Sequence, residues 1–110
     1  MKEFLIFTNK SIDDVSCNVL DWADVKGIFK YGKPYGQIKL LASEVIELLD
    51  AVNKGDKYEE MSELGDILVL CTIIAEMRGF TLEDAYNVAW EKIKDRKGKL
   101  NKDGVFVKEA

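Results

Sequence analysis

Residues 37–78 read QIKLLASEVIELLDAVNKGDKYEEMSELGDILVLCTIIAEMR, two helix-forming runs joined by a short connection that contains glycine. In the first run apolar residues recur every three or four positions, which is the period of a helix with one buried face. The pattern predicts one helix over residues 37–53, which Gly55 ends. It predicts a second helix over residues 58–78, which ends before Gly79. Because the connection is short, the two helices should pack as antiparallel neighbours.

The second of these helices is apolar on nearly every side in its C-terminal part. Ten of the fourteen residues from 64 to 77 are apolar. A helix of this kind must be covered on several sides. It is too short for a bilayer and is interrupted by Asp66, so it is either the central helix of a bundle or part of an interface between subunits.

The helical pattern continues on both sides of this pair. A first helix is expected from Ser11, whose side chain can cap it, to Lys26. Another is expected to begin after Thr81 and to continue to Gly98, with acidic residues in its first turn and basic residues in its last turns.

The remaining segments lack a helical pattern. Residues 27–36 contain three glycines, the single proline and three aromatic residues, which predicts an irregular loop. Residues 99–110 predict an extended tail. The chain is therefore expected to form one domain, residues 1–110, with a helical body over residues 11–98. The predicted fold class is all-α, an antiparallel four-helix bundle that is oligomeric.

The composition is that of an ordinary globular protein, with 110 residues, 47% apolar and 33% charged. The absence of histidine excludes Ser-His-Asp triads and zinc or di-iron centres held by histidine. Cys17 and Cys71 are interpreted as reduced core thiols of a cytoplasmic protein. The apolar run at residues 4–7 is too short for a signal peptide or a membrane span, so no membrane partner is expected.

Charge is distributed unevenly along the chain. The net charge of −4, from 16 basic and 20 acidic residues, argues against a general nucleic-acid or membrane-surface binder. Residues 91–110 carry seven basic and four acidic side chains, net +3, which leaves −7 on residues 1–90. Such a chain could bind a ligand that combines a cation with several phosphates. A solvated helix end followed by a tail would produce the same distribution.

Two acidic dyads are the most informative feature of the two central helices. Glu44 and Glu47 are three positions apart in the first, and Glu63 and Asp66 are three apart in the second. Residues at this spacing share one helical face. Both dyads fall on faces that also carry apolar residues, so all four carboxylates are expected to point inward. The tight turn between the helices would then make the two dyads face each other.

Four converging carboxylates require compensating charge, because isolated buried carboxylates are very costly. Oxygen ligands without histidine select hard cations, so Mg²⁺ or Mn²⁺ is expected in preference to zinc or iron. One such dyad alone is more often a solvated helix face. Two inward-facing dyads around one turn favour a metal site instead.

The whole constellation resembles the MazG-like all-α nucleoside triphosphate pyrophosphohydrolases, particularly the compact single-domain form seen in phage and mobile-element proteins. The resemblance covers about residues 20–108. Its core is the Glu-x-x-Glu motif, fifteen intervening residues and the Glu-x-x-Asp motif. It continues through Gly79-Phe-Thr-Leu-Glu-Asp-Ala85, Lys92-Ile-Lys-Asp-Arg-Lys-Gly98 and Asp103-Gly-Val-Phe-Val-Lys108.

The resemblance implies hydrolysis of a ribo- or deoxyribonucleoside triphosphate between its α and β phosphates, giving a monophosphate and pyrophosphate in nucleotide-pool house-cleaning. It implies Mg²⁺, with Mn²⁺ as a possible substitute, held by Glu44, Glu47, Glu63 and Asp66. It also implies a homodimer or a dimer of dimers, which would explain the apolar helix.

The resemblance further suggests roles for individual side chains. One of the dyad glutamates, Glu47 in preference to Glu44, would take the proton of the attacking water. Lys92 and Arg96 match a Lys-x-x-x-Arg pattern of the family and would neutralise the triphosphate, although basic residues there also suit a helix C-terminus.

Three further residues are candidates for nucleotide binding. Trp22 could stack on the base, although core packing is the alternative for any such aromatic residue. Trp90 occupies a position where longer relatives commonly carry asparagine, so Asn87, one turn earlier, could supply the polar contact instead. Lys39 lies off the Glu44 face and is a weaker candidate.

Two other functions stay open at this stage. The chain could be a non-catalytic helical interaction module in which the dyads bind a cation only for stability. It could also hydrolyse a related phosphoanhydride, such as an alarmone, a nucleotide-sugar or a phosphoribosyl compound.

Overall fold

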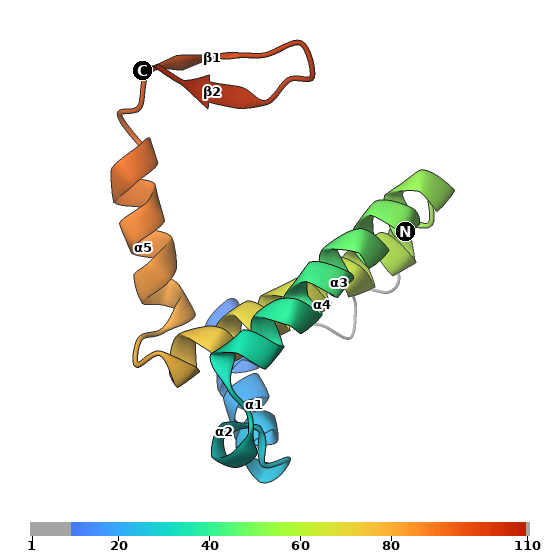
Figure 1. Ribbon diagram of the computed structural model, residues 1–110, viewed down its shortest axis with the longest axis vertical. Helices are drawn as coiled ribbons and strands as arrows, with labels where there is room; N and C mark the ends of the chain where they lie inside the picture. Colours follow the sequence, from blue (N-terminus) through green and yellow to red (C-terminus); the bar gives the residue numbers. More distant parts are fainter. Residues whose placement is uncertain (1–9, 110) are drawn as a thin grey trace.

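The structure is a computed structural model that describes residues 10–109 (Figure 1). The predicted apolar run at residues 4–7 lies outside the described residues. The described part of the chain is mostly helical, as predicted, with a small two-stranded sheet at its C-terminal end. The elements, in chain order, are α1 (Ile12–Val25), α2 (Ile28–Tyr31), α3 (Pro34–Lys54), α4 (Lys57–Met77), α5 (Leu82–Ile93), β1 (Gly98–Leu100) and β2 (Phe106–Lys108).

The helix boundaries follow from local capping chemistry. Ser11 caps α1, because its hydroxyl accepts a hydrogen bond from the Asp14 amide at 3.1 Å. Gly55 ends α3 in the left-handed conformation, with φ of 73°. Thr81 and Asp84 form a reciprocal capping box at the start of α5. These ends confirm the predicted starts of α1 and α5 and the predicted turn between the central helices.

The predicted loop and the predicted last helix are both wrong in detail. Residues 27–36 contain the short helix α2 and the first turn of α3, which begins at Pro34 because proline presets a helical φ and needs no amide partner there. Helix α5 ends at Ile93 instead of continuing to Gly98. Arg96 therefore lies outside this helix.

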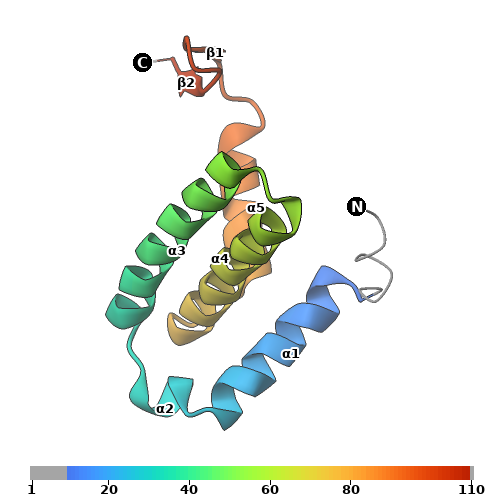
Figure 2. The same ribbon diagram turned by 90° about the vertical axis from the view of Figure 1, so that its right-hand side faces the viewer.

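Helices α3 and α4 form an antiparallel pair at the centre of the molecule, and α1 packs against α4 (Figure 2). The small core lies where these helices meet, and its large buried side chain is Ile73 of α4. Its other buried apolar residues are Ala23, Ala51, Leu70 and Ala75.

Helix α4 is only partly enclosed in the single chain. Leu70, Ile73 and Ala75 are buried, as its apolar character predicts, whereas Leu64 and Leu68 are about half exposed. Within residues 10–109, every helix is too short or too polar to cross a bilayer. Neither burial in the core of one chain nor a membrane span therefore accounts for the apolar side chains that stay exposed on α4.

The C-terminal tail is extended, as expected, but it folds into a β-hairpin. Strands β1 and β2 pair antiparallel, with Lys99 opposite Val107. The Asn101 side-chain oxygen accepts hydrogen bonds from the Asp103 and Val105 amides at 2.9 and 3.0 Å, which closes the turn. The Phe106 ring lies over Gly98, where an added Cβ would come within 2.7 Å of the ring. We call α5 and this hairpin, residues 82–109, the C-terminal arm.

A four-helix bundle is not seen in the described part of one chain. Helix α5 packs against α4 near their connection and then diverges from the α3–α4 pair, and the hairpin lies beyond its end (Figure 1). The chain exposes 8926 Å² of surface, whereas a compact monomer of 12.5 kDa exposes about 6,200 Å². Its radius of gyration is 16.3 Å, compared with about 13 Å for a compact chain of this length.

The two cysteines were both predicted to be core thiols, but their surroundings differ. Both are free, but Cys17 is exposed on α1 and is not a core thiol. Cys71 is half-buried, and this burial raises the pKa of its thiol.

Candidate functional site

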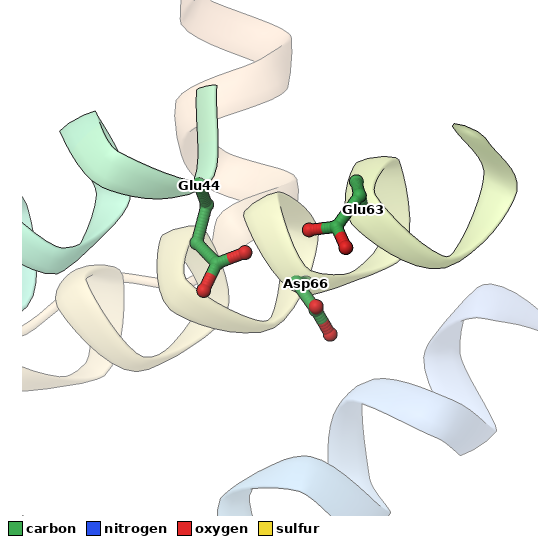
Figure 3. Close-up of side chains that lie close together, drawn as sticks. All are labelled: Glu44, Glu63 and Asp66. Carbon is green, nitrogen blue, oxygen red and sulfur yellow. The ribbon is translucent and has the colours of Figure 1, made fainter. Parts of the chain in front are cut away.

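Three of the four predicted carboxylates meet between the central helices. Glu44 lies in the middle of α3, and Glu63 and Asp66 lie in the first half of α4. The reversal at Gly55 brings these segments side by side, and one oxygen from each carboxylate lies within 4.8 Å of the others. Figure 3 shows the three side chains pointing into the same space. We call Glu44, Glu63 and Asp66 the acidic cluster.

The fourth carboxylate, Glu47, lies beside this cluster. Its carboxyl group interacts with that of Glu44, but its side chain is exposed. Asp66 is also exposed, whereas Glu44 and Glu63 are half-buried. The prediction that all four carboxylates face inward is therefore wrong for two of them. Residues three apart differ by about 60° around the helix axis. One member of each dyad is therefore half-buried between the two helices, and the other lies at the solvent-exposed edge of the helix pair.

The acidic cluster is electrostatically uncompensated in the single chain. Among residues 10–109, Oε2 of Glu44 and Oε2 of Glu63 are buried and meet no hydrogen-bond donor. The carboxyl of Glu47, burial and the carboxyl of Glu63 raise the pKa of Glu44 from 4.5 to about 7, because Glu44 can donate a hydrogen bond to these neighbours only when it is protonated, and repulsion by Glu47 and Asp66 adds to this rise. Across residues 10–109, no lysine or arginine forms an ion pair with these four carboxylates.

This donor set fits a hard divalent cation. All the available ligands are carboxylate oxygens, and two of them are buried atoms that have no other partner. Mg²⁺ and Mn²⁺ prefer such oxygen ligands, and they usually keep several waters while binding phosphate oxygens as well. A bound cation would supply the positive charge that this part of the chain lacks.

The predicted phosphate ligands lie elsewhere in the single chain. Lys92 is in the last turn of α5 and Arg96 follows the end of that helix, whereas the predicted last helix contained both residues. Helix α5 packs against α4 near their connection, whereas the acidic cluster lies in the first half of α4. The structure does not bring Lys92 and Arg96 to the cluster of their own chain.

The predicted nucleotide-binding residues lie on three different helices. Trp22 is near the end of α1 and is 50% exposed. Asn87, with Tyr86 and Trp90, lines a hollow of about 220 Å³ on α5. Lys39 lies over the Tyr35 ring on α3, with its ammonium nitrogen 5.5 Å from the ring centroid. The single chain does not assemble these residues into one pocket.

Two features of the structure were not predicted from the sequence. Glu60, one turn before Glu63, has a buried Oε2 without a hydrogen-bond partner and forms an ion pair with Lys57 at 3.5 Å. Its spacing of three from Glu63 repeats that of the dyad and was a usable signal. The other feature is a hollow of about 500 Å³ on the hairpin, for which the sequence offers no clear signal. Its lining includes Lys97, Lys99 and Lys108.

Comparison with known proteins adds one match. A family model described as the MazG nucleotide pyrophosphohydrolase domain matches residues 34–100. The matched segment runs from the start of α3 to the end of β1 and includes all four carboxylates, Lys92 and Arg96. Helix α1, with Trp22, lies outside it. No curated protein and no solved structure matches the chain.

Proposed function

The chain belongs to the MazG nucleotide pyrophosphohydrolase family, and from this premise we propose that it hydrolyses nucleoside triphosphates to monophosphates and pyrophosphate in a Mg²⁺-dependent reaction. The proposed role is the clearance of unwanted ribo- or deoxyribonucleotides from the nucleotide pool. The observation that carries the proposal is the convergence of Glu44, Glu63 and Asp66, with oxygens within 4.8 Å of one another. The buried Oε2 atoms of Glu44 and Glu63, which have no partner, support it.

The metal ligands in this proposal are the acidic cluster and Glu47. When bound there, Mg²⁺ supplies polarisation of the phosphoryl oxygens and lowers the pKa of a water molecule. Mn²⁺ is an acceptable substitute, because it takes the same oxygen ligands.

The carboxylates also supply the base. Glu47 is exposed and adjacent to Glu44, so it can take a proton from a water molecule at the solvent-facing side of the cluster. Glu44 is the alternative, because its carboxyl lies beside that of Glu47 in the same group of carboxylates. In the reaction the water oxygen bonds to phosphorus, the bridging bond between the α and β phosphates breaks, and pyrophosphate leaves.

The remaining predicted side chains bind the substrate in this proposal. Lys92 and Arg96 neutralise the phosphates. Trp22 is exposed enough to stack on the base, and Asn87 and Lys39 are candidates for polar contacts to the nucleoside. Recognition of the base thus depends on aromatic faces and few polar groups.

Self-association is the second part of the proposal, as a homodimer or a dimer of dimers. Four apolar side chains on one face of α3 are between 51% and 59% exposed. We call this face the α3 stripe, which consists of Ile38, Val45, Leu49 and Val52. The exposed surface of one chain exceeds that of a compact monomer by about 2,700 Å², or about 5,400 Å² for two chains, which is at the upper end of the total area that obligate dimers bury. Two α3–α4 pairs packed through their α3 stripes would form the predicted four-helix bundle from two chains.

The activity is tested by measuring pyrophosphate and monophosphate release from a panel of ribo- and deoxyribonucleoside triphosphates, with Mg²⁺ and with a chelator. We expect release only with the metal. Glu63→Gln should lower kcat/KM by at least about 100-fold, because it removes a charged ligand at the reacting centre. Glu83→Gln makes the same substitution at an exposed residue in the first turn of α5, and it should leave activity near the wild-type value.

Two outcomes would contradict this function. Unchanged activity in Glu63→Gln would exclude the acidic cluster as the reacting site. Absence of product from every triphosphate would favour the interaction module, unless alarmones, nucleotide-sugars or phosphoribosyl compounds in the same panel are cleaved.

A further inference from the structure

Residues 25–43 form a strongly basic segment in an otherwise acidic chain. The segment reads VKGIFKYGKPYGQIKLLAS and contains Lys26, Lys30, Lys33 and Lys39 but no aspartate or glutamate. Its net charge is therefore +4, and because the whole chain carries −4, the other residues together carry −8. The overall charge, which argues against a general nucleic-acid binder, conceals this local concentration of positive charge.

The fold places the segment at one end of the molecule, where α2 lies between the end of α1 and the start of α3 (Figure 2). Two tyrosine side chains are largely exposed there, Tyr31 at 76% and Tyr35 at 74%. The ammonium nitrogen of Lys30 lies 5.3 Å from the Tyr31 ring centroid, and that of Lys39 lies 5.5 Å from the Tyr35 ring centroid. We call Lys30, Tyr31, Lys33, Tyr35 and Lys39 the Lys–Tyr surface.

The Lys–Tyr surface has no neutralising partner in the described part of the chain. Within residues 10–109, none of its three lysines forms an ion pair with a carboxylate. The carboxylates of Asp24 and Glu76 line a hollow beside Phe29, and the lining of that hollow includes none of the five residues. Two exposed aromatic rings and three ammonium groups are therefore available to a ligand.

This surface does not share a helix face with the acidic cluster. Around the axis of α3, Tyr35 is about 180° and Lys39 about 140° from Glu44. Glu44 lies between α3 and α4, so both residues lie on the side of α3 that is turned away from the cluster. A ligand of the Lys–Tyr surface is therefore separate from the nucleotide that the acidic cluster would hold.

The chemistry of the surface selects one kind of ligand. Small ligands bind best in concave sites, whereas this surface is open and suits a polymer that combines several weak contacts. Lysines and tyrosines alternate along the segment, as phosphates and bases alternate along a nucleic-acid strand. A duplex hides its base faces, and an acidic peptide offers charge without planar groups. Only single strands present both features.

We propose that the Lys–Tyr surface binds single-stranded DNA or RNA, with bases stacked on Tyr31 and Tyr35 and phosphates paired with Lys30, Lys33 and Lys39. Each ring has two faces, so a lysine can stay on one face while a base stacks on the other. The inference goes beyond the proposed function, because it needs neither the metal nor the acidic cluster.

Fluorescence anisotropy of a labelled oligothymidylate of about 12 nucleotides tests the proposal. The probe has no triphosphate, and a chelator removes any contribution of a metal at the acidic cluster. The logarithm of the association constant should fall against the logarithm of salt concentration with a slope of about −2, because three lysines each neutralise one phosphate of the strand. The same probe paired in a duplex should bind about 10-fold more weakly or less, because its bases cannot stack on the rings.

Two double variants separate stacking from charge. Tyr31→Leu with Tyr35→Leu should weaken binding about 10-fold or more and keep the salt slope. Lys30→Gln with Lys33→Gln should reduce the slope to about −0.7, because one of the three phosphate contacts remains. Tyr86→Leu makes the same change at a tyrosine of α5 that is 78% exposed, and it should bind the probe as the wild type does.

The lysines of the hairpin provide a second control. Lys99→Gln with Lys108→Gln removes the same charge from the hollow on the hairpin and should leave the affinity for the probe near the wild-type value. Loss of binding in this variant, or unchanged affinity in the tyrosine variant, would overturn the proposal. A wild-type protein that binds vesicles of anionic lipid but not the oligonucleotide would overturn it as well.

Pyrophosphate release distinguishes this inference from the proposed function. The tyrosine variant should release pyrophosphate at the wild-type rate, because its changes lie on the far side of α3 from Glu44; loss of release would contradict a separate surface. A wild-type protein that releases pyrophosphate but does not bind the probe would overturn this inference alone. One that binds the probe but releases no pyrophosphate would overturn the proposed function alone. Circular dichroism of each variant confirms that lost binding is not lost helix.

Discussion

Glu44 and Glu47 are one helical turn apart on α3, yet their surroundings differ. Glu44 is half-buried against α4, where it shares space with Glu63 and Asp66, and Glu47 is exposed. The neighbouring carboxyl of Glu47 and burial raise the pKa of Glu44 to about 7, so in the metal-free protein this carboxyl is about half protonated at neutral pH. Binding of a cation and loss of that proton are therefore linked at this residue.

This linkage predicts how stability depends on pH. Because the pKa of Glu44 is higher in the folded protein than its ordinary 4.5, the folded state binds the proton more tightly than the unfolded state. The stabilisation from protonation is complete below pH 4.5 and is lost as the pH rises through about 7. Thermal unfolding in chelator should show Tm falling across this window, and Mg²⁺ should raise Tm above pH 7.

The matched variant for this measurement is Glu44→Gln, which cannot titrate. It should flatten the fall in Tm between pH 4.5 and 7, whereas Glu83→Gln should keep it. An equal fall in Glu44→Gln would show that other groups cause the pH dependence.

At the scale of the elements, the starts of α1 and α5 and the end of α3 were predictable, and the hairpin was not. Ser11, Gly55 and Thr81 end or begin helices through hydrogen bonds and backbone conformations that involve only the next few residues. The hairpin depends on pairing between residues six to ten positions apart, with Lys99 opposite Val107. Strands of only three residues each carry a weak local signal for such pairing.

The pairing of the two hairpin strands can be tested without changing any charge on the C-terminal arm. Gly98→Ala would place a methyl group about where the Phe106 ring and the Val107 carbonyl oxygen lie, so it should disrupt the pairing of β1 with β2. Amide exchange at Asn101, whose N–H donates to the Val105 carbonyl at 2.8 Å, should become faster while helix content stays unchanged. Gly36→Ala, where an added Cβ meets nothing within 4 Å, is the control. Unchanged exchange in Gly98→Ala would show that the ring and strand can move apart at little cost.

At the scale of the whole molecule, the single chain leaves much apolar surface uncovered. The predicted core face of α3 is largely exposed, because α4 covers the neighbouring face that carries Glu44. The same packing of α3 on α4 that brings the acidic cluster together therefore leaves the α3 stripe exposed. In the proposed function, both self-association and catalysis would depend on the orientation of this one helix.

This orientation predicts the effect of a charge in the α3 stripe. Leu49→Asp should convert the oligomer to a monomer, because a carboxylate buried in an apolar interface without a partner is strongly unfavourable. Light scattering coupled to size-exclusion chromatography measures the mass. Asn53→Asp, which adds the same charge near the exposed end of α3 and outside the stripe, should keep the wild-type mass. A wild-type protein that already has the mass of one chain would contradict the proposed interface.

The residues alone were sufficient to identify the four long helices, the acidic dyads and the family, because capping, helical period and motif spacing are local properties of the chain. They were not sufficient to show which carboxylates are half-buried and which are exposed, since Glu47 and Asp66 differ from Glu44 and Glu63 only in how α3 and α4 are rotated against each other. They were also not sufficient to show that α5 diverges from that pair and carries Lys92 and Arg96 away from the cluster. Both features depend on packing between helices, where side chains distant in the chain come into contact and select one rotation and one crossing angle.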